Sequence, residues 1–178
     1  MLMFCDVKIN YKIMNENQGK SDKTKNLTKR TNCLSWHEYF ASIARLVAQR
    51  SKDPNYQVGA LMINQQKEIV ATGYNGFPWG FSDDKYFWND EGPWLETKYP
   101  YCVHAEANAV ISAKQNCQGF ILYTTLFPCN ECAKLIIQAG IKTIYYLHWP
   151  VSEQWGESWK ATKIMFDEVG IDYQKLEV

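Results

Sequence analysis

The pattern of apolar and polar positions changes at Ser35, where a helical period begins. Between Tyr39 and Val47 the apolar residues recur at the spacing of one helix face. Ser35 and Glu38 have the spacing of a capping box, in which each side chain accepts the backbone N–H of the other residue. Together these features predict a first helix over residues 36–50.

Strand-like patterns follow this predicted helix. Residues 58–63 and 69–74 favour strands, and the short polar segment between them predicts a hairpin. Residues 76–101 hold three prolines, three glycines and three tryptophans without a clean period, which predicts a structured surface excursion of the kind that often serves a site. The pattern then alternates, with helices predicted over 104–114, 131–139 and 159–169 and strands over 120–126, 143–148 and 171–176.

The order of these elements predicts the fold class. A helix, a hairpin and then alternating helices and strands are typical of an α/β domain in which helices cover both faces of a mixed sheet. Residues 15–32 are polar and poor in apolar side chains. We therefore expect residues 1–33 to form a basic, disordered tail and residues 34–178 to form the folded domain.

Composition restricts the location and the partners of the chain. Hydrophobic residues make up 46% and charged residues 21%, as in a soluble globular protein, and the sequence has neither a run of 18 apolar residues nor a secretory signal pattern. We expect a cytoplasmic protein, or a nuclear one, that does not bind a membrane. The formal net charge is zero and the basic excess lies in the tail, so a surface for a polynucleotide is not expected.

Two short motifs open two of the predicted helices. They are His104-Ala105-Glu106 and Pro128-Cys129-Asn130-Glu131-Cys132. Cysteines at i and i+3 lie on one helix face and the helix N-terminus favours their thiolate forms, so Cys129 and Cys132 can bind one ion together with His104. Three such ligands leave one position of a tetrahedral zinc open, as in catalytic sites. We predict one catalytic Zn2+ per subunit.

Glu106 is the predicted proton carrier. It lies two residues after His104, so it is not expected to bind the metal, but it can reach a water molecule at the open position. The pattern H-x-E followed by P-C-x-x-C is typical of zinc-dependent nucleobase deaminases. The motifs therefore predict hydrolysis of the exocyclic amine of cytosine, with Glu106 moving protons from water to N3 of the ring and to the leaving amine.

Two other interpretations of these cysteines are possible. The C-x-x-C pair also occurs in thiol redox proteins, but that reading leaves His104 and Glu106 without a role. A closed structural zinc site would need a fourth ligand, for which Cys102 is the nearest candidate. Burial without a ligand is the default for Cys102 and Cys117.

Several segments resemble the deoxycytidylate deaminase family. The resemblance covers about residues 36–147. The segments that carry it are residues 49–55, 57–60, 73–76 (GYNG), 82–84, 97–101, 104–106 and 126–141. It implies conversion of dCMP to dUMP, which supplies thymidylate synthesis, and a three-layer α/β/α cytidine-deaminase-like fold. It also implies a homo-oligomer, commonly a hexamer, that dCTP activates and dTTP inhibits, with Mg2+ accompanying a triphosphate effector.

The resemblance also implies roles for individual residues. Arg50, Lys52 and Asn55 are expected to bind the phosphate or the sugar, although Arg50 and Lys52 taken alone fit a solvated helix end equally well. The remaining substrate residues are expected to lie beside the nucleotide, and two residues of the GYNG segment are expected to bind the effector instead of merely ending a strand. These residues are Val58, Ala60, Ala105 and Tyr123 for the substrate, and Tyr74 and Asn75 for the effector.

The segment 148–159 departs from the family pattern. Its three tryptophans fit a core or a subunit interface better than a changed nucleotide platform, but the departure leaves the substrate chain length and the effector open. Other readings are therefore a deaminase of dCTP, cytidine or cytosine in single-stranded nucleic acid, and a non-catalytic zinc-stabilised protein. The presence of Glu106 favours an enzyme, because a non-catalytic protein does not need a carboxylate there.

Overall fold

The computed structural model describes residues 28–150 and 156–178. It divides the chain into Met1–Cys33 and Leu34–Val178, and every helix and strand of the described residues lies in the second unit. The predictions for residues 1–27 and for Trp155 lie outside the described residues. No described helix is both long enough and apolar enough to cross a lipid bilayer.

The first helix, α1 (Trp36–Ala48), begins at the predicted capping box. The Ser35 hydroxyl accepts the backbone N–H of Glu38 at 3.2 Å, and the Glu38 carboxylate accepts the backbone N–H of Ser35 at 2.7 Å. These bonds satisfy two amide groups that the helix geometry leaves without partners. The predicted start of the helix is confirmed, and its end comes two residues earlier than predicted.

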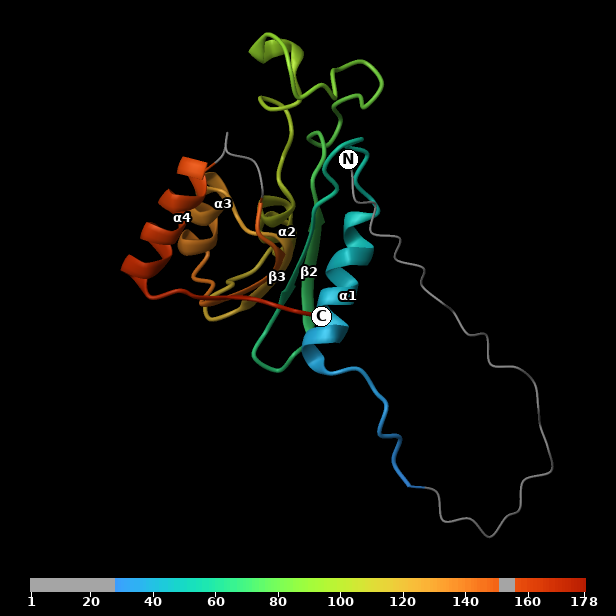
Figure 1. Cartoon of the computed structure of the whole chain (residues 1–178), viewed down its shortest axis with the longest axis vertical. Coiled ribbons are helices and arrows are strands. Elements are labelled where there is room, and N and C mark those ends of the chain that lie inside the picture. The colour runs from blue at the N-terminus through green and yellow to red at the C-terminus, as the bar shows by residue number, and fades with distance from the viewer. Residues whose placement is uncertain (1–27, 151–155) are drawn as a thin grey trace, which may run out of the picture. The chain divides into compact units, whose positions relative to one another are not determined.

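A five-stranded mixed sheet forms the centre of the domain (Figure 1). Its order is β2-β1-β3-β4-β5, in which β1 runs antiparallel to both of its neighbours while β3, β4 and β5 run parallel. The predicted mixed sheet is confirmed. The strands are β1 (Gly59–Ile63), β2 (Ile69–Tyr74), β3 (Ile121–Leu126), β4 (Thr143–His148) and β5 (Asp172–Lys175).

Helices cover both faces of the sheet, which confirms the three-layer α/β/α arrangement (Figure 1). Helix α1 packs on one face, against β1, β2 and β3. On the other face α2 (Ala105–Ala113) packs against β2 and β1, beside α3 (Asn130–Gln138), and α4 (Gly156–Val169) packs against α3. Successive side chains of each strand point to opposite faces of the sheet, so the strands contribute to two separate cores, one on each face.

The predicted excursion between β2 and α2 contains the short helix η1 (Trp94–Glu96) and stacked aromatic side chains. The ring centroids of Phe77 and Trp88 are 4.1 Å apart, and those of Phe81 and Tyr86 are 3.8 Å apart. Offset or stacked rings at such distances stabilise a segment beyond the area they bury. The excursion thus has apolar contacts of its own.

Two tryptophans of the segment 148–159 are described. Trp159 on α4 is buried in the core of the α2 and α3 face, while Trp149 is 40% exposed and its ring packs 4.6 Å from that of Phe127. Trp159 therefore belongs to the core, one of the two roles favoured by the sequence.

Candidate active site

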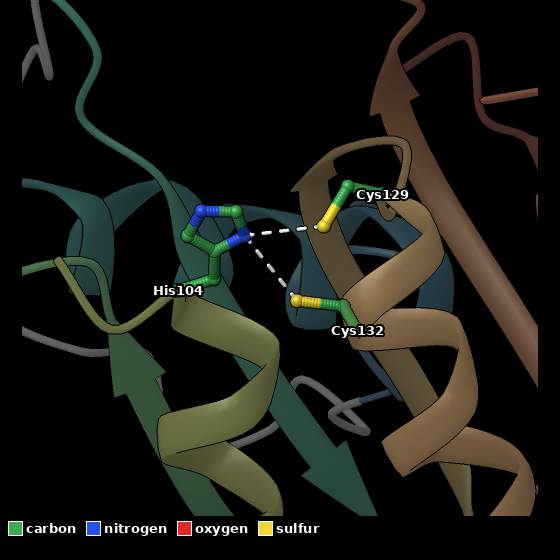
Figure 2. Close-up of side chains that lie close together, drawn as sticks. All are labelled: His104, Cys129 and Cys132. Carbon is green, nitrogen blue, oxygen red and sulfur yellow. Dashed lines mark hydrogen bonds between the residues drawn. The ribbon is translucent and has the colours of Figure 1, made fainter. Parts of the chain in front are cut away.

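The three predicted metal ligands come together where two helices begin (Figure 2). His104 is the N-cap residue of α2, and Cys129 is the N-cap residue of α3, with Cys132 in the first turn of α3. The Nδ1 atom of His104 lies 3.3 Å from the Cys129 sulfur and 3.4 Å from the Cys132 sulfur. The predicted cluster is therefore present in the structure.

This donor set fits a zinc ion. One ligand atom from each of the three residues lies within 4.8 Å of the others. Tetrahedral zinc with Zn–S bonds of about 2.3 Å and a Zn–N bond of about 2.0 Å needs its nitrogen and sulfur donors about 3.5 Å apart, close to the observed separations. Cys132 is buried, Cys129 is half-buried and His104 is exposed, so a site formed by them opens towards solvent on the histidine side.

When no metal is bound, the side chains of the cluster strongly shift one another's pKa values. A hydrogen bond from the Cys132 thiol, helped by His104, lowers the pKa of Cys129 to about 4. The hydrogen bond with Cys129 in turn raises the pKa of His104 to about 9. The N-termini of α2 and α3 add partial positive charge beside the sulfur atoms. Cys129 is thus held as a thiolate, the form that binds zinc, while its hydrogen bond with Cys132 raises the pKa of the Cys132 thiol well above the usual value.

Glu106 lies beside the ligands without belonging to their cluster. Its side chain is buried, one carboxylate oxygen lies 3.5 Å from the Cys132 sulfur, and the other lies 3.3 Å from the Thr124 hydroxyl. Burial raises the pKa of Glu106 above its usual range. A carboxyl group that is close to a metal site, but free to take and give protons, suits general acid–base catalysis.

The position of α2 depends on a close approach to β2. A Cβ atom at Gly73 would clash with the backbone of α2, because the helix rests directly on this residue of the strand. Beyond the strand, Gly76 and Val103 exchange two backbone hydrogen bonds of 3.1 and 2.8 Å, and Val103 directly precedes His104. The end of β2 therefore fixes the first turn of α2 and with it the histidine ligand.

The loop with the predicted substrate residues meets the same end of β2. The backbone N–H of Asn75 donates to the Val58 carbonyl at 3.2 Å, next to the Gly76–Val103 pair. Arg50, Lys52 and Asn55 are exposed in the loop, and Val58 is half-buried. The structure thus joins this loop, through β2, to the segment that carries His104.

Strand pairing decides which of the other predicted substrate residues can face the ligands. Ala60 pairs with Thr124, and both are buried on the sheet face that α2 and α3 cover. Ala105 is the first residue of α2 and is buried as well. Both alanines therefore lie on the side of the sheet that carries the cysteine and histidine ligands.

Tyr123 does not lie on that side. Its side chain packs in the core under α1, where its hydroxyl lies 3.0 Å from Nδ1 of His37. Successive side chains of a strand point to opposite faces, so Tyr123 faces away from the site when its neighbour Thr124 faces Glu106. This placement on the opposite face of the sheet does not support the expectation that Tyr123 borders the nucleotide.

The two predicted effector residues differ in exposure. Tyr74 is 39% exposed, whereas Asn75 is buried. The Asn75 amide group donates to the Tyr56 carbonyl at 2.8 Å and accepts the backbone N–H of Val58 at 2.8 Å. The side chain of Asn75 therefore holds the backbone of the loop between α1 and β1 at Tyr56 and Val58.

Cys102 lies outside the ligand cluster. Its sulfur is 3.8 Å from the Val103 carbonyl oxygen, and burial raises the pKa of its thiol to about 11. Among the described residues, His104, Cys129 and Cys132 form the one cluster with metal-binding geometry. The alternative of a fourth cysteine ligand is not supported.

Sequence reasoning gave no role to several polar residues that contact the site or its loop. Thr124 contacts Glu106, and the Ser158 hydroxyl accepts the backbone N–H of Asn130 at the start of α3. Asp53 and Lys98 form a buried ion pair behind the loop. Strand alternation could have identified Thr124, whereas the partners of the other residues lie far away in the sequence.

Comparison with known proteins agrees with this geometry. Residues 34–148 match the family described as the cytidine and deoxycytidylate deaminase zinc-binding region. The deoxycytidylate deaminase of Homo sapiens is 47% identical to the chain over 151 residues, which cover 83% of each sequence. The probable deoxycytidylate deaminase of Drosophila melanogaster is 47% identical over 156 residues, covering 83% of this chain and 75% of that protein.

A solved structure shares the fold. The crystal structure of dCMP deaminase from the cyanophage S-TIM5, in complex with dCMP and dUMP, superposes with a TM-score of 0.62 at 26% identity. The match covers 79% of this chain and 96% of the phage protein.

Proposed function

Because the chain belongs to the cytidine and deoxycytidylate deaminase family, we propose that it deaminates deoxycytidylate. In this reaction dCMP and one water molecule give dUMP and ammonia. The observation that carries the proposal is the cluster of His104, Cys129 and Cys132 with the buried Glu106 carboxylate 3.5 Å from the Cys132 sulfur. The deoxynucleotide is supported by relatives of 46–48% identity that are named deoxycytidylate deaminases.

Glu106 performs the proton transfers in this proposal. When bound to the three ligands, zinc supplies Lewis-acid activation of a water molecule. Glu106 takes one proton from the water molecule while the water oxygen bonds to C4 of the ring. Glu106 then passes that proton to N3. It then carries the second proton to the amine nitrogen, so that the C4–N bond breaks and ammonia leaves. Burial of Glu106 keeps these protons from exchanging with bulk water.

The substrate phosphate is proposed to bind the exposed donors of the loop before β1. Lys52 donates to Asp83 at 2.5 Å, and the Asn55 amide donates to Asp90 at 2.8 Å. A phosphate can replace these half-buried carboxylates as the acceptor for the exposed donors, and Arg50 adds a guanidinium group suited to phosphate. Val58, Ala60 and Ala105 are proposed to form the apolar wall beside the pyrimidine.

We also propose that nucleotides regulate the enzyme. We expect dCTP to activate and dTTP to inhibit, with Mg2+ accompanying the triphosphate, and we expect a homo-oligomer, a hexamer by family resemblance. Tyr74 has an accessible ring for an effector nucleotide, being 39% exposed. Asn75, whose amide already bonds within the fold, would transmit the effect through the Val58 and Tyr56 backbone.

The proposal is tested by ammonia release from the zinc-loaded protein. We expect kcat/KM to be higher for dCMP than for cytidine, deoxycytidine or dCTP, and we expect dCTP and dTTP to change the rate in opposite directions. Absence of dCMP turnover would overturn the proposed reaction. Turnover without any response to dCTP or dTTP would overturn only the regulatory part.

A further inference from the structure

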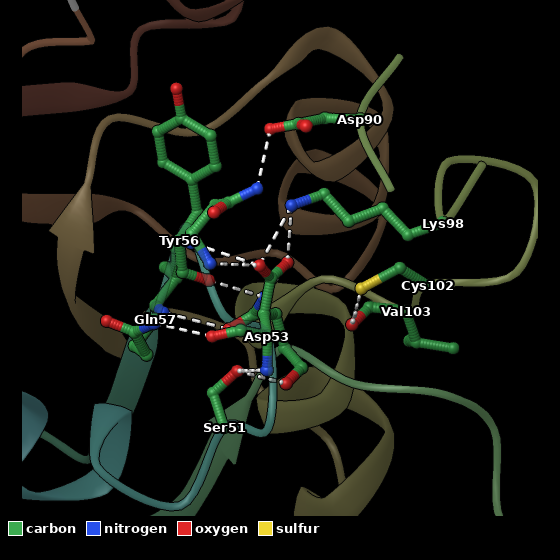
Figure 3. A network of polar contacts seen from close by, with 11 residues as sticks. Ser51, Asp53, Tyr56, Gln57, Asp90, Lys98, Cys102 and Val103 are labelled. Carbon is green, nitrogen blue, oxygen red and sulfur yellow. Dashed lines mark hydrogen bonds and ion pairs between the residues drawn. The ribbon is translucent and has the colours of Figure 1, made fainter. Parts of the chain in front are cut away.

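A buried ion pair connects the excursion with the loop that carries the proposed substrate residues (Figure 3). The Lys98 ammonium lies 2.8 Å from the Asp53 carboxylate, and their side chains are only 5% and 2% exposed. Removing two charges from water is unfavourable, so a buried pair is weak evidence for stability alone. Its partners indicate what it does.

Asp53 organises the loop from inside. One of its carboxylate oxygens accepts the backbone N–H groups of Asn55 at 2.9 Å and of Tyr56 at 3.0 Å. The Lys98 ammonium also lies 5.0 Å from the centre of the Tyr56 ring, within the range of a cation–π contact. The ion pair therefore fixes the turn that places the Asn55 side chain.

Lys98 is connected to the metal-ligand segment at its other end. The Lys98 carbonyl accepts the backbone N–H of Cys102 at 2.9 Å, and the next residue, Val103, forms the backbone pair with Gly76 just before His104. The backbone N–H of Lys98 donates to the Asn89 carbonyl at 2.9 Å, deeper in the excursion. Lys98 thus contacts the loop at Asp53, the excursion at Asn89, and, at Cys102, the segment that leads into His104.

The other polar links between loop and excursion are of a different kind. Lys52 pairs with Asp83 at the surface, and the Asn55–Asp90 bond is also exposed. Water and a phosphate both compete for such exposed donors, and exposed pairs contribute little to rigidity. The Asp53–Lys98 pair is buried, so it can hold the loop without giving up its partners when the substrate binds.

We propose that Asp53 and Lys98 are positioning residues, which hold the loop of residues 51–57 so that Asn55 and Lys52 face the phosphate of the substrate. The inference rests on the proposed deamination of dCMP. It predicts that loss of the pair weakens recognition of the phosphorylated substrate and leaves the deamination chemistry at Glu106 and the metal ligands intact.

The test replaces both partners, because a single Lys98 substitution would leave an unpaired buried charge. The double variant Asp53→Asn with Lys98→Met keeps the net charge and an oxygen that accepts the two loop amides. The matched control is Glu157→Gln with Lys160→Met, which removes an exposed ion pair on α4. Each protein is loaded with zinc and assayed with dCMP and with deoxycytidine, which lacks the phosphate.

We expect the double variant to raise KM for dCMP about 10-fold to 100-fold, with kcat within about threefold of the unaltered protein. The ratio of kcat/KM for dCMP to that for deoxycytidine should fall by a similar factor, while the control changes neither quantity. Hydrogen exchange of the Asn55 and Tyr56 amides should become faster in the double variant without any substrate present. Mere loss of folded protein would lower kcat for both substrates and leave KM unchanged.

An unchanged KM and an unchanged substrate ratio in a folded double variant would overturn the inference and leave the proposed function standing. If thermal melting shows that this double variant is unfolded, the more polar double variant Asp53→Asn with Lys98→Gln, which also leaves no buried charge, is judged by the same two quantities. An unaltered protein that releases no ammonia from dCMP would overturn the proposed function, and this inference with it.

Discussion

Gly73 lies so close to α2 that a Cβ atom on it would stand 2.2 Å from the carbonyl oxygen of Ala105. The atom would also stand 2.4 Å from the backbone nitrogen of Ala109, so no side-chain movement can relieve the contact. Ala105 directly follows His104 in the chain. A residue of β2 with no chemistry of its own therefore controls where His104, the proposed metal ligand, lies.

Replacement of this glycine tests that relationship. We expect Gly73→Ala to lower the free energy of unfolding by about 1–3 kcal/mol, because overpacking pushes α2 away from the sheet. Denaturant unfolding measures the change, and zinc content should fall with it. Gly76→Ala is the matched control, since its Cβ would meet its nearest atom at 3.9 Å. Equal stability of the two variants would contradict the packing argument.

Glu106→Gln separates the chemistry from the metal site. The amide has the shape of the carboxylate but cannot carry protons, so we expect turnover of dCMP to fall by at least about 100-fold. Zinc content, measured by atomic absorption, should stay near one per chain because Glu106 is not a ligand. The control Glu131→Gln changes an exposed carboxylate on α3 and should keep most of the activity. Normal turnover by zinc-loaded Glu106→Gln would rule out the assigned role.

Zinc uptake by the metal-free protein should release protons. At pH 7 His104 is protonated, because contact with Cys129 raises its pKa to about 9, and Cys132 is protonated because the same neighbour raises its pKa well above the ordinary value. Cys129 is already ionised, since its pKa is lowered to about 4. We therefore expect about two protons to leave per zinc bound.

Calorimetric titration in buffers of different ionisation enthalpy measures this number. Because protons compete with the metal, zinc affinity should rise steeply with pH up to about pH 9, where His104 loses its proton unaided, and less steeply above it, where Cys132 still has to release a proton. The proton count should stay near two between about pH 5 and pH 8. A count near three would show that Cys129 is protonated, and a count near zero would show that neither His104 nor Cys132 is.

Thr124→Val tests a smaller effect on Glu106. The Thr124 hydroxyl lies 3.0 Å from the Leu126 carbonyl and 3.3 Å from the Glu106 carboxylate, and it has one proton to donate. Because the carbonyl contact is the shorter, we expect the variant to lower kcat by less than about tenfold. Steady-state kinetics with dCMP checks the value. A loss as large as that of Glu106→Gln would instead make Thr124 essential for placing the carboxylate.

The elements of the domain could be predicted from the sequence because their signals are local. The capping box at Ser35, the strand-favouring residues of β3 and the glycine after α3 depend only on neighbouring residues, and each predicted boundary lies within three residues of the observed one. The ligand set was also predictable. His104, Cys129 and Cys132 stand at the beginnings of two helices, and donor chemistry at such spacing has few other uses.

Neither the direction of a side chain nor a partner far away in the chain can be predicted from neighbouring residues alone. The family resemblance implies that Tyr123 borders the nucleotide, but strand alternation turns its side chain towards His37 and α1. Lys98 sits in a polar segment of the excursion, and nothing near it in the sequence shows that it is buried against Asp53.

The sequence by itself determined the mixed α/β layers and the zinc ligands with Glu106, because periodicity and motif spacing are properties of contiguous residues. Only the tertiary structure decided that Gly73 supports α2, that Tyr123 packs under α1, and that Lys98 forms a buried ion pair with Asp53. Those facts depend on contacts between residues far apart in the chain, 45 positions for Lys98 and Asp53 and 86 positions for Tyr123 and His37. Such contacts form only when the strands and the excursion have been brought together around the sheet.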